Sequence, residues 1–82
     1  GKGVTFDTGG LDLKPASGMR LMKKDMAGSA SMVGLAHLCS TLQLRTSADF
    51  YLPLAENAVS EKSTRPGDVH TARNKMLVEI DN

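Results

Sequence analysis

The chain alternates between short apolar runs and polar connections that are rich in glycine. Residues 4–6 (Val-Thr-Phe) are β-branched or aromatic, and the turn-forming run Asp-Thr-Gly-Gly follows at once. This pattern predicts a strand that ends at Asp7 and runs into a tight turn. Residues 11–24 contain Pro15 and Gly18 and show no sustained period, so we expect an ordered loop there.

Residues 26–44 carry the pattern of an amphipathic helix. Apolar side chains recur at i, i+3, i+4, i+7 and i+10, namely at Met32, Leu35, Ala36, Cys39 and Leu42. Asp25 stands directly before this segment, which is the place of an N-cap residue. Small residues crowd the first turns of the helix and favour close approach of a neighbouring backbone or ligand.

A second apolar run covers residues 48–55. Its nearly continuous hydrophobicity is typical of a strand buried on both faces of a parallel sheet, although Pro53 argues against a fully paired central position. Residues 68–72 and 76–80 can pair as a hairpin around the turn at 74–75. The sequence therefore predicts the α/β class: a mostly parallel sheet with flanking helices, a right-handed β-α-β crossover and a C-terminal hairpin.

Composition limits what this chain can bury and bind. Its 82 residues include only 4% aromatics and no Trp, so we expect one small domain at most, with a limited core. A net charge of +1 gives no electrostatic reason to expect nucleic acid or an anionic membrane as partner. One cysteine, Cys39, cannot form an internal disulfide and favours a reducing compartment.

Two lysines and two aspartates in the first third of the chain are the candidate chemistry: Lys2, Asp7, Lys14 and Asp25. Asp7 is expected at the carboxyl end of a strand, where ligands of open α/β sheets bind. Carboxylates from adjacent element ends can hold one divalent ion or bridge two. A charged Lys14 could polarise a carbonyl or hold a developing oxyanion.

Structural roles can also explain each of these residues alone. Asp25 can cap the helix, Asp7 can bind its own backbone in the turn, and lysines are usually solvated. No Cys or second His stands at metal-ligand spacing from either histidine. We therefore assign packing, surface or pocket-lining positions to the remaining candidates: His37, His70, Cys39, Met19, Met22 and Met26.

Three other functional hypotheses stay open at this stage. Residues 6–9 (Phe-Asp-Thr-Gly) resemble the catalytic turn of aspartic proteases, which needs two such turns and a shared proton. The Asp-x-Gly-Gly turn also resembles the first phosphate loop of the actin-like sugar kinases, without a supporting P-loop pattern. A non-catalytic module, with capping and solvated side chains, is the third.

Several blocks taken together resemble the leucyl aminopeptidase (cytosol aminopeptidase) family. The first is Gly-Lys-Gly-Val-Thr-Phe-Asp-Thr-Gly-Gly at the start of the chain, followed by Lys-Pro and by Met-Lys-Lys-Asp-Met-Ala-Gly. Ala-Glu-Asn, Arg-Pro-Gly-Asp and Val-Glu-Ile-Asp-Asn continue the resemblance in the same order. The blocks cover essentially the whole chain, residues 1–82.

The resemblance implies a catalytic domain of α/β fold that binds two divalent metal ions, Mn or Zn or alternatively Mg. Water activated by the two ions would attack the carbonyl of the N-terminal peptide bond. The resemblance makes Lys2, Asp7 and Asp25 metal ligands, with Asp7 bridging both ions. It makes Lys14 the catalytic residue that faces the substrate carbonyl, and it places Met22 in the pocket for the first side chain of the substrate.

Two departures from the family pattern shape the expectation. Asp25 is followed by Met-Ala-Gly, where the family usually has Met-Gly-Gly. The family motif Asn-Thr-Asp-Ala-Glu-Gly-Arg, with two more metal ligands and the Arg that holds a bicarbonate, would begin at Asn82. We therefore expect residues 1–82 to be part of a catalytic domain, truncated at both ends and inactive alone.

The resemblance implies a cytoplasmic parent enzyme that forms a homo-hexamer. Its substrates would be peptides with a free N-terminus, and neither nucleic acid nor membrane is expected as a partner. The alternative is a naturally short relative without hydrolase activity.

Overall fold

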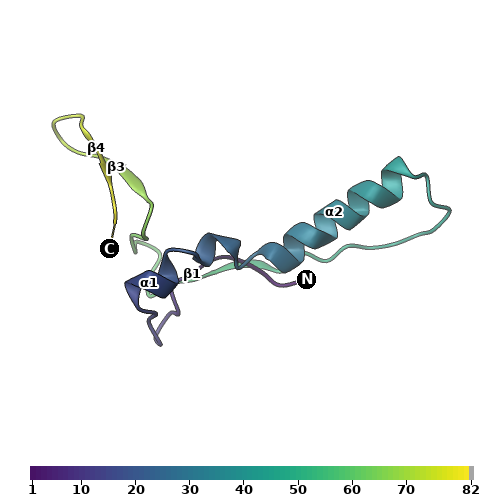
Figure 1. The fold of residues 1–82 in the computed structure, drawn as a ribbon, viewed down its shortest axis with the longest axis horizontal. Helices are drawn as coiled ribbons and strands as arrows, with labels where there is room; N and C mark the ends of the chain where they lie inside the picture. The colour runs from purple at the N-terminus through teal and green to yellow at the C-terminus, as the bar shows by residue number, and fades with distance from the viewer. Residues whose placement is uncertain (82) are drawn as a thin grey trace.

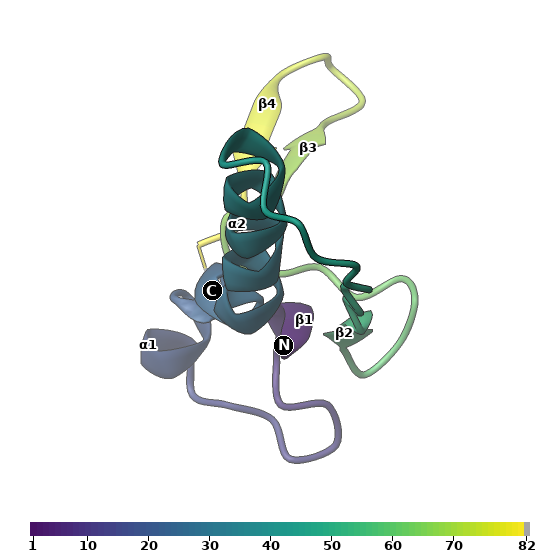
Figure 2. The same ribbon diagram turned by 90° about the vertical axis from the view of Figure 1, so that its right-hand side faces the viewer.

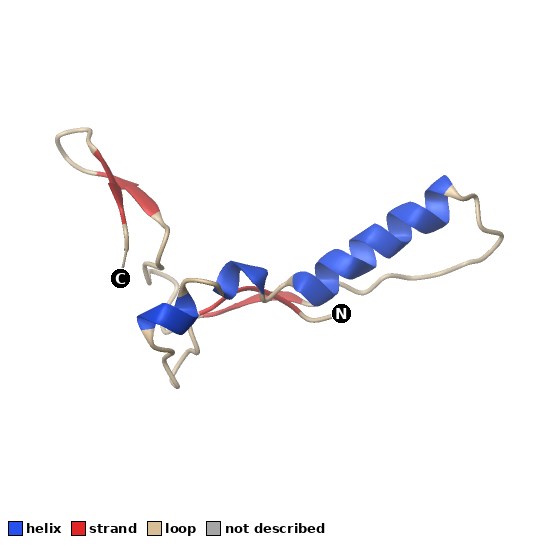
Figure 3. Ribbon diagram, viewed as in Figure 1, coloured by secondary structure: helices blue, strands red, loops and turns tan. Residues whose placement is uncertain are grey.

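The computed structural model describes residues 1–81 and contains two small sheets, one long helix and two single helical turns (Figure 1, Figure 3). Asn82, where the family motif would begin, lies outside the described residues. The predicted order of strand, loop, long helix, strand and hairpin is confirmed. The elements are β1 (Gly3–Asp7), α1 (Ala16–Met19), the 3₁₀ turn η1 (Met22–Lys24), α2 (Ala27–Thr41), β2 (Leu54–Asn57), β3 (Val69–Thr71) and β4 (Leu77–Glu79).

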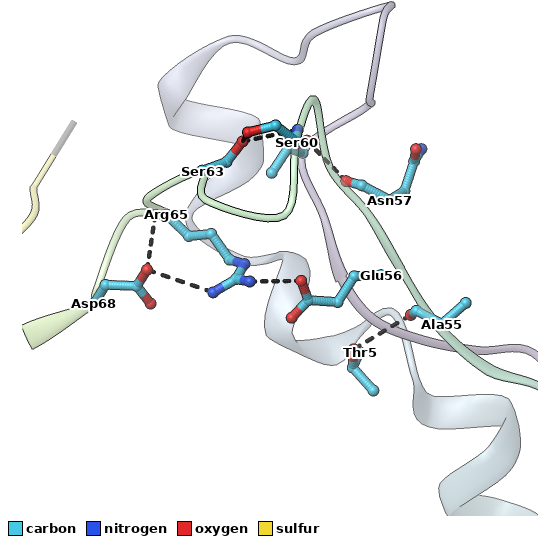
Figure 4. Close-up of polar contacts among 9 residues, drawn as sticks. Thr5, Ala55, Glu56, Asn57, Ser60, Ser63, Arg65 and Asp68 are labelled. Atoms are coloured by element: carbon cyan, nitrogen blue, oxygen red, sulfur yellow. Dashed lines mark hydrogen bonds and ion pairs between the residues drawn. The ribbon is translucent and has the colours of Figure 1, made fainter.

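The strands β1 and β2 pair in parallel, as the sequence predicted. Their register shifts between Val4 and Phe6, so that Thr5 has no opposite residue in β2. The Thr5 hydroxyl donates to the Ala55 carbonyl at 3.2 Å and so stays attached to the partner strand (Figure 4). Beyond this irregularity, Asp7 lies opposite Asn57, and the two strands end side by side.

The predicted bounds of the second strand were wrong. Residues 48–53 are not in a strand, and β2 begins only after Pro53. Proline has no backbone N–H and disfavours some conformations of the residue before it, and the Leu54 N–H turns back to the Leu52 carbonyl at 2.9 Å. All four residues of β2 are exposed, so burial on both faces is also wrong for residues 1–81.

The long helix lies within the predicted range, but its first residue is not capped by Asp25. Met26 is the N-cap, and its side chain makes no capping hydrogen bond within the part of the chain that the structure describes. The Asp25 N–H instead bonds to the Met22 carbonyl and closes η1. The N-cap assignment of Asp25 is therefore wrong, because the preceding 3₁₀ turn fixes that residue's backbone. The segment expected to be a loop contains this turn and α1.

The first turn of α2 lies against the first two residues of the chain. The Ser29 N–H donates to the Lys2 carbonyl at 2.7 Å, and the Ser29 hydroxyl donates to the Gly1 carbonyl, also at 2.7 Å. Ser29 is buried. A Cβ on Gly28 would lie 2.6 Å from the Lys2 nitrogen, so the small residues at this point do permit close backbone approach, as expected.

The hydrophobic core is small. Phe6, in β1, is the one large apolar side chain that is buried within residues 1–81, at 4% exposure. The helix α2 projects away from the sheet in both views (Figure 1, Figure 2), and the molecule measures 55 × 32 × 21 Å. Apolar side chains of α2 therefore stay exposed, among them Val33, Leu35 and Leu38 at 46–54%. None of the helices within residues 1–81 has the length and apolar character needed to cross a membrane.

The C-terminal hairpin has the predicted turn. The strands β3 and β4 are antiparallel, with Val69 opposite Glu79 and Thr71 opposite Leu77. Lys75 has a positive φ of 68°. The Lys75 N–H bonds to the Ala72 carbonyl and the Met76 N–H bonds to the Asn74 side chain, which closes the turn.

The close contact at Gly28 generates a stability prediction. Gly28→Ala should lower the free energy of unfolding by about 1–3 kcal/mol, because the new Cβ meets backbone atoms that cannot rotate away. The control is Gly34→Ala in the same helix, where a Cβ meets no atom of residues 1–81 within 4 Å. It should stabilise by about 0.5–1 kcal/mol. Denaturant unfolding measures both, and equal effects of the two substitutions would contradict the packing described here.

Candidate functional site

The candidate site begins where β1 ends and the chain turns sharply. Thr8 is buried, and both its N–H and its hydroxyl donate to the Asn57 carbonyl, at 2.9 and 2.7 Å. Gly9 and Gly10 follow with φ of 94° and 63°, a backbone region that favours glycine. A Cβ on Gly10 would lie 2.5 Å from the Asn57 side-chain oxygen, so the turn packs directly against the end of β2.

The Asp7 carboxylate is held by three donors. Its Oδ1 accepts the Gly9 N–H at 2.9 Å and the Asn57 side-chain amide at 2.8 Å. Its Oδ2 lies 3.1 Å from Lys14 Nζ, and the two side chains are 15% and 32% exposed. The Lys14 backbone is fixed in turn, because its N–H donates to the Thr8 carbonyl at 2.9 Å.

These donors favour the ionised form of Asp7. The Gly9 N–H first, and then the bond from Lys14, lower the pKa of the Asp7 carboxyl below its ordinary value. The Asn57 amide and the positive charge of Lys14 act in the same direction, whereas partial burial opposes them. Asp7 is therefore a carboxylate with a fixed orientation.

Asp25 pairs with Lys2, the second lysine of the candidate set. Lys2 Nζ lies 3.1 Å from Asp25 Oδ1, with 63% of the lysine side chain and 20% of the aspartate side chain exposed. The other carboxylate oxygen, Oδ2, is buried and has no hydrogen-bond partner within residues 1–81. A buried acceptor without a donor is costly in free energy, and this oxygen could coordinate a cation instead.

The structure brings the four candidates together as two lysine–aspartate pairs. The 3₁₀ turn that precedes Asp25 packs against the strand that ends at Asp7. No ion pair or hydrogen bond within residues 1–81 joins one pair to the other. That part of the chain also contains no group of three or more His, Cys, Asp or Glu side chains that could hold a metal ion.

Met22 is half-buried at the start of η1. A cavity of about 390 Å³ lies beside Lys14, and its lining includes Met19 but not Met22. The histidines His37 and His70 are exposed, which agrees with the surface positions assigned to them, and Cys39 is half-buried. The cavity gives Lys14 an open, mostly apolar neighbourhood.

Asn57 is the site residue that the site prediction omitted. It lies at the carboxyl end of β2, beside the carboxyl end of β1, where α/β folds place their functional groups. That rule would have identified Asn57 if the second strand had been given its true bounds. The predicted end at residue 55 placed the asparagine in a polar loop instead.

Comparison with known proteins assigns the chain to a family. Residues 1–82 match the model of the catalytic domain of the cytosol aminopeptidase family. The chain belongs to that family. The resemblance inferred from the sequence blocks is thus confirmed, and membership displaces the aspartic protease and sugar kinase alternatives.

Individual cytosol aminopeptidases align along the whole chain. It is 46% identical to the cytosol aminopeptidase of Dictyostelium discoideum and 46% identical to a probable cytosol aminopeptidase of Solibacter usitatus, over all 82 residues in both cases. The crystal structure of the Coxiella burnetii cytosol aminopeptidase superposes on 96% of the chain with a TM-score of 0.59 and 44% identity. The chain spans only 16–17% of the length of these relatives.

The contacts of Asp7 generate a prediction about its titration. Lys14→Met should raise the pKa of the Asp7 carboxyl toward its ordinary value, and Asn57→Ala should raise it less. Because the folded-state pKa is lowered, ionised Asp7 stabilises the fold above its unfolded pKa, and this contribution is lost as the pH falls through the folded pKa. The carboxyl ¹³C shift of Asp7, followed against pH, measures the change.

Lys2→Met is the matched control for this titration, since Lys2 pairs with Asp25. This substitution should leave the pKa of the Asp7 carboxyl at its wild-type value. Equal displacement by Lys2→Met and Lys14→Met would contradict the assignment of separate pairs.

Proposed function

We propose that residues 1–82 form part of the catalytic domain of a metal-dependent aminopeptidase that releases N-terminal amino acids from peptides. The observation that carries this proposal is the pair of oriented carboxylates, Asp7 and Asp25, on contacting elements of a cytosol aminopeptidase chain. Metal dependence is general in this family. The relatives are named aminopeptidases, and we propose the same substrate class, peptides with a free N-terminus, for this protein.

The residues present fit divalent ions as one side of a site. Asp25 Oδ2 is buried and receives no hydrogen bond from residues 1–81, which is the state of a carboxylate oxygen that a cation can satisfy. Gly9, Lys14 and Asn57 hold Asp7 ionised and oriented. We propose Asp7 as the bridging ligand, Asp25 and Lys2 as flanking ligands, and Mn, Zn or Mg as the ions.

The bound ions would supply a water of lowered pKa and polarise the scissile carbonyl. The chain's own contribution is orientation and charge. Lys14 stands on the turn after β1, with its backbone bonded to Thr8, and its ammonium could stabilise the negative charge that develops on the carbonyl oxygen. Met22 is proposed to line the pocket for the first side chain of the substrate, where a flexible thioether adapts to different shapes.

We propose further that the complete site needs chain beyond these residues. The relatives are about six times longer, and residues 1–81 contain no group of three acidic or imidazole ligands. The exposed apolar side chains of α2 also need a covering surface. The parent protein is proposed to be a cytoplasmic homo-hexamer that uses bicarbonate in proton transfer, and residues 1–82 alone are proposed to be inactive.

The first test of this proposal is hydrolysis. In the complete polypeptide that carries this sequence, Asp7→Asn should reduce metal-dependent cleavage of an aminoacyl amide by roughly 10³-fold or more, because the bridging charge is lost. Lys14→Met should reduce kcat by roughly 10²–10³-fold. Asp12→Asn, at an exposed position of the same turn, is the control. A wild-type protein without activity under any of the three metals would favour the non-catalytic alternative.

The second test is metal binding without turnover. Divalent ions should raise the Tm of the wild-type polypeptide by mass action. Asp25→Asn should raise the Kd of the ion by at least about 10-fold, since it removes a ligand oxygen and leaves a neutral amide. Calorimetric titration measures the affinity. An unchanged Kd would remove Asp25 from the ligand set even if hydrolysis is metal-dependent.

A further inference from the structure

Arg65 lies between two carboxylates that belong to different elements. Its Nη2 is 2.5 Å from Glu56 Oε2, and its Nη1 is 3.5 Å from Asp68 Oδ2 (Figure 4). The backbone N–H of Arg65 donates to the same Asp68 oxygen at 2.9 Å. Only 23% of the arginine side chain is exposed. Because Glu56 is in β2 and Asp68 directly precedes β3, Arg65 connects the two sheets.

The base of the Arg65 side chain is fixed by a tight turn. The Asp68 N–H donates to the Arg65 carbonyl at 3.0 Å, and the turn contains the buried Pro66 and then Gly67 at φ 86°, the residues that a type II turn favours. The turn is anchored to the hairpin by two bonds with Ile80, from the Gly67 N–H at 2.6 Å and to the Asp68 carbonyl at 2.8 Å. The guanidinium therefore starts from a rigid support.

Glu56, the partner of Arg65 in β2, lies next to the residue that binds the Asp7 carboxylate. Glu56 lies opposite Phe6 in the parallel pair and directly precedes Asn57. The Asn57 side-chain amide donates to Asp7, and the Asn57 carbonyl accepts from Thr8. Each residue of β2 is exposed, so little apolar burial holds the end of this strand. The ion pair between Arg65 and Glu56 is placed to restrict the movement of this strand end.

We infer that Arg65 is a positioning residue for the proposed site. By holding Glu56, it fixes the end of β2, so that Asn57 keeps its contacts with Asp7 and Thr8. Arginine suits this role because a planar guanidinium can bind two carboxylates at once, whereas the compact ammonium of lysine cannot match that geometry. The inference rests on the proposed function for its effect on catalysis, but its effect on Asp7 can be measured separately.

Amide hydrogen exchange of the metal-free, complete polypeptide tests the positioning itself. The amides of Thr8, Gly9 and Gly10 bond to Asn57, Asp7 and Thr8. Arg65→Ala should speed their exchange by at least about 10-fold, since opening of this turn becomes easier. Arg73→Ala, at an exposed position of the hairpin turn, should change none of the three.

The same measurement shows whether Arg65 acts only on its own turn. Faster exchange confined to the amides of Gly67, Asp68 and Ile80, with Thr8 to Gly10 unchanged, would overturn the inference. Arg65→Lys keeps the positive charge and replaces Arg65→Ala in this measurement if the alanine variant does not fold. It should give an intermediate increase at Thr8 to Gly10, and wild-type exchange there would equally overturn the inference.

Kinetics of the metal-loaded polypeptide test the catalytic consequence. Arg65→Ala should lower kcat for an aminoacyl amide by about 10-fold or more with KM within about twofold, because orientation rather than binding is lost. Added guanidinium should restore part of kcat in Arg65→Ala, whereas urea at the same concentration should not. An unchanged kcat in this variant, beside an active wild type, would overturn the catalytic part of the inference.

An inactive wild type would instead mark failure of the proposed function. In that case, faster exchange at Thr8 to Gly10 in Arg65→Ala would still support the positioning role, so that the two failures can be told apart.

Discussion

The geometry of the candidate site depends on the bonds that Asn57 makes across the parallel pair. Its carbonyl receives two donors from Thr8, and its side-chain amide binds the Asp7 carboxylate. These bonds lie at the ends of the strands, where the ladder can no longer supply partners. Backbone and side-chain hydrogen bonds of this kind contribute only about 1 kcal/mol each to stability. Their larger effect is to fix the direction in which the Asp7 carboxylate points.

The two lysine–aspartate pairs determine the charge that a cation would meet. In each pair an ammonium compensates a carboxylate, so the four side chains together carry no net charge. A divalent ion that binds both aspartates must compete with these ammonium groups or displace them. The more exposed Lys2 can move into water at little cost, whereas Lys14 is held through its backbone bond to Thr8. This difference in restraint agrees with separate roles for the two lysines.

Most of the fold could be predicted from periodicity and turn chemistry, and the failures have local causes. The first strand and the helix follow from clear patterns, namely the strand-to-turn pattern of residues 4–10 and the apolar spacing of residues 26–44, and the hairpin follows from a weaker turn signal at residues 74–75. The apolar run placed the second strand too early, because Pro53 was expected only to weaken its pairing, whereas β2 begins after this proline. That same error hid Asn57. The Arg65 contacts could not be predicted, since ion pairs between distant segments depend on tertiary placement and not on sequence spacing.

The exposed apolar surface of α2 supports the proposal that residues 1–82 belong to a larger protein. Val33, Leu35 and Leu38 lie on a helix that projects from the sheet and are 46–54% exposed. Covering side chains of this size contributes about 1.5–3 kcal/mol each, whereas Phe6 is the one large apolar side chain that the described residues bury. The first turn of α2 also carries the contacts with Lys2. A surface that packs on the later turns of α2 would therefore also fix Lys2 and Asp25, which lie beside its first turn.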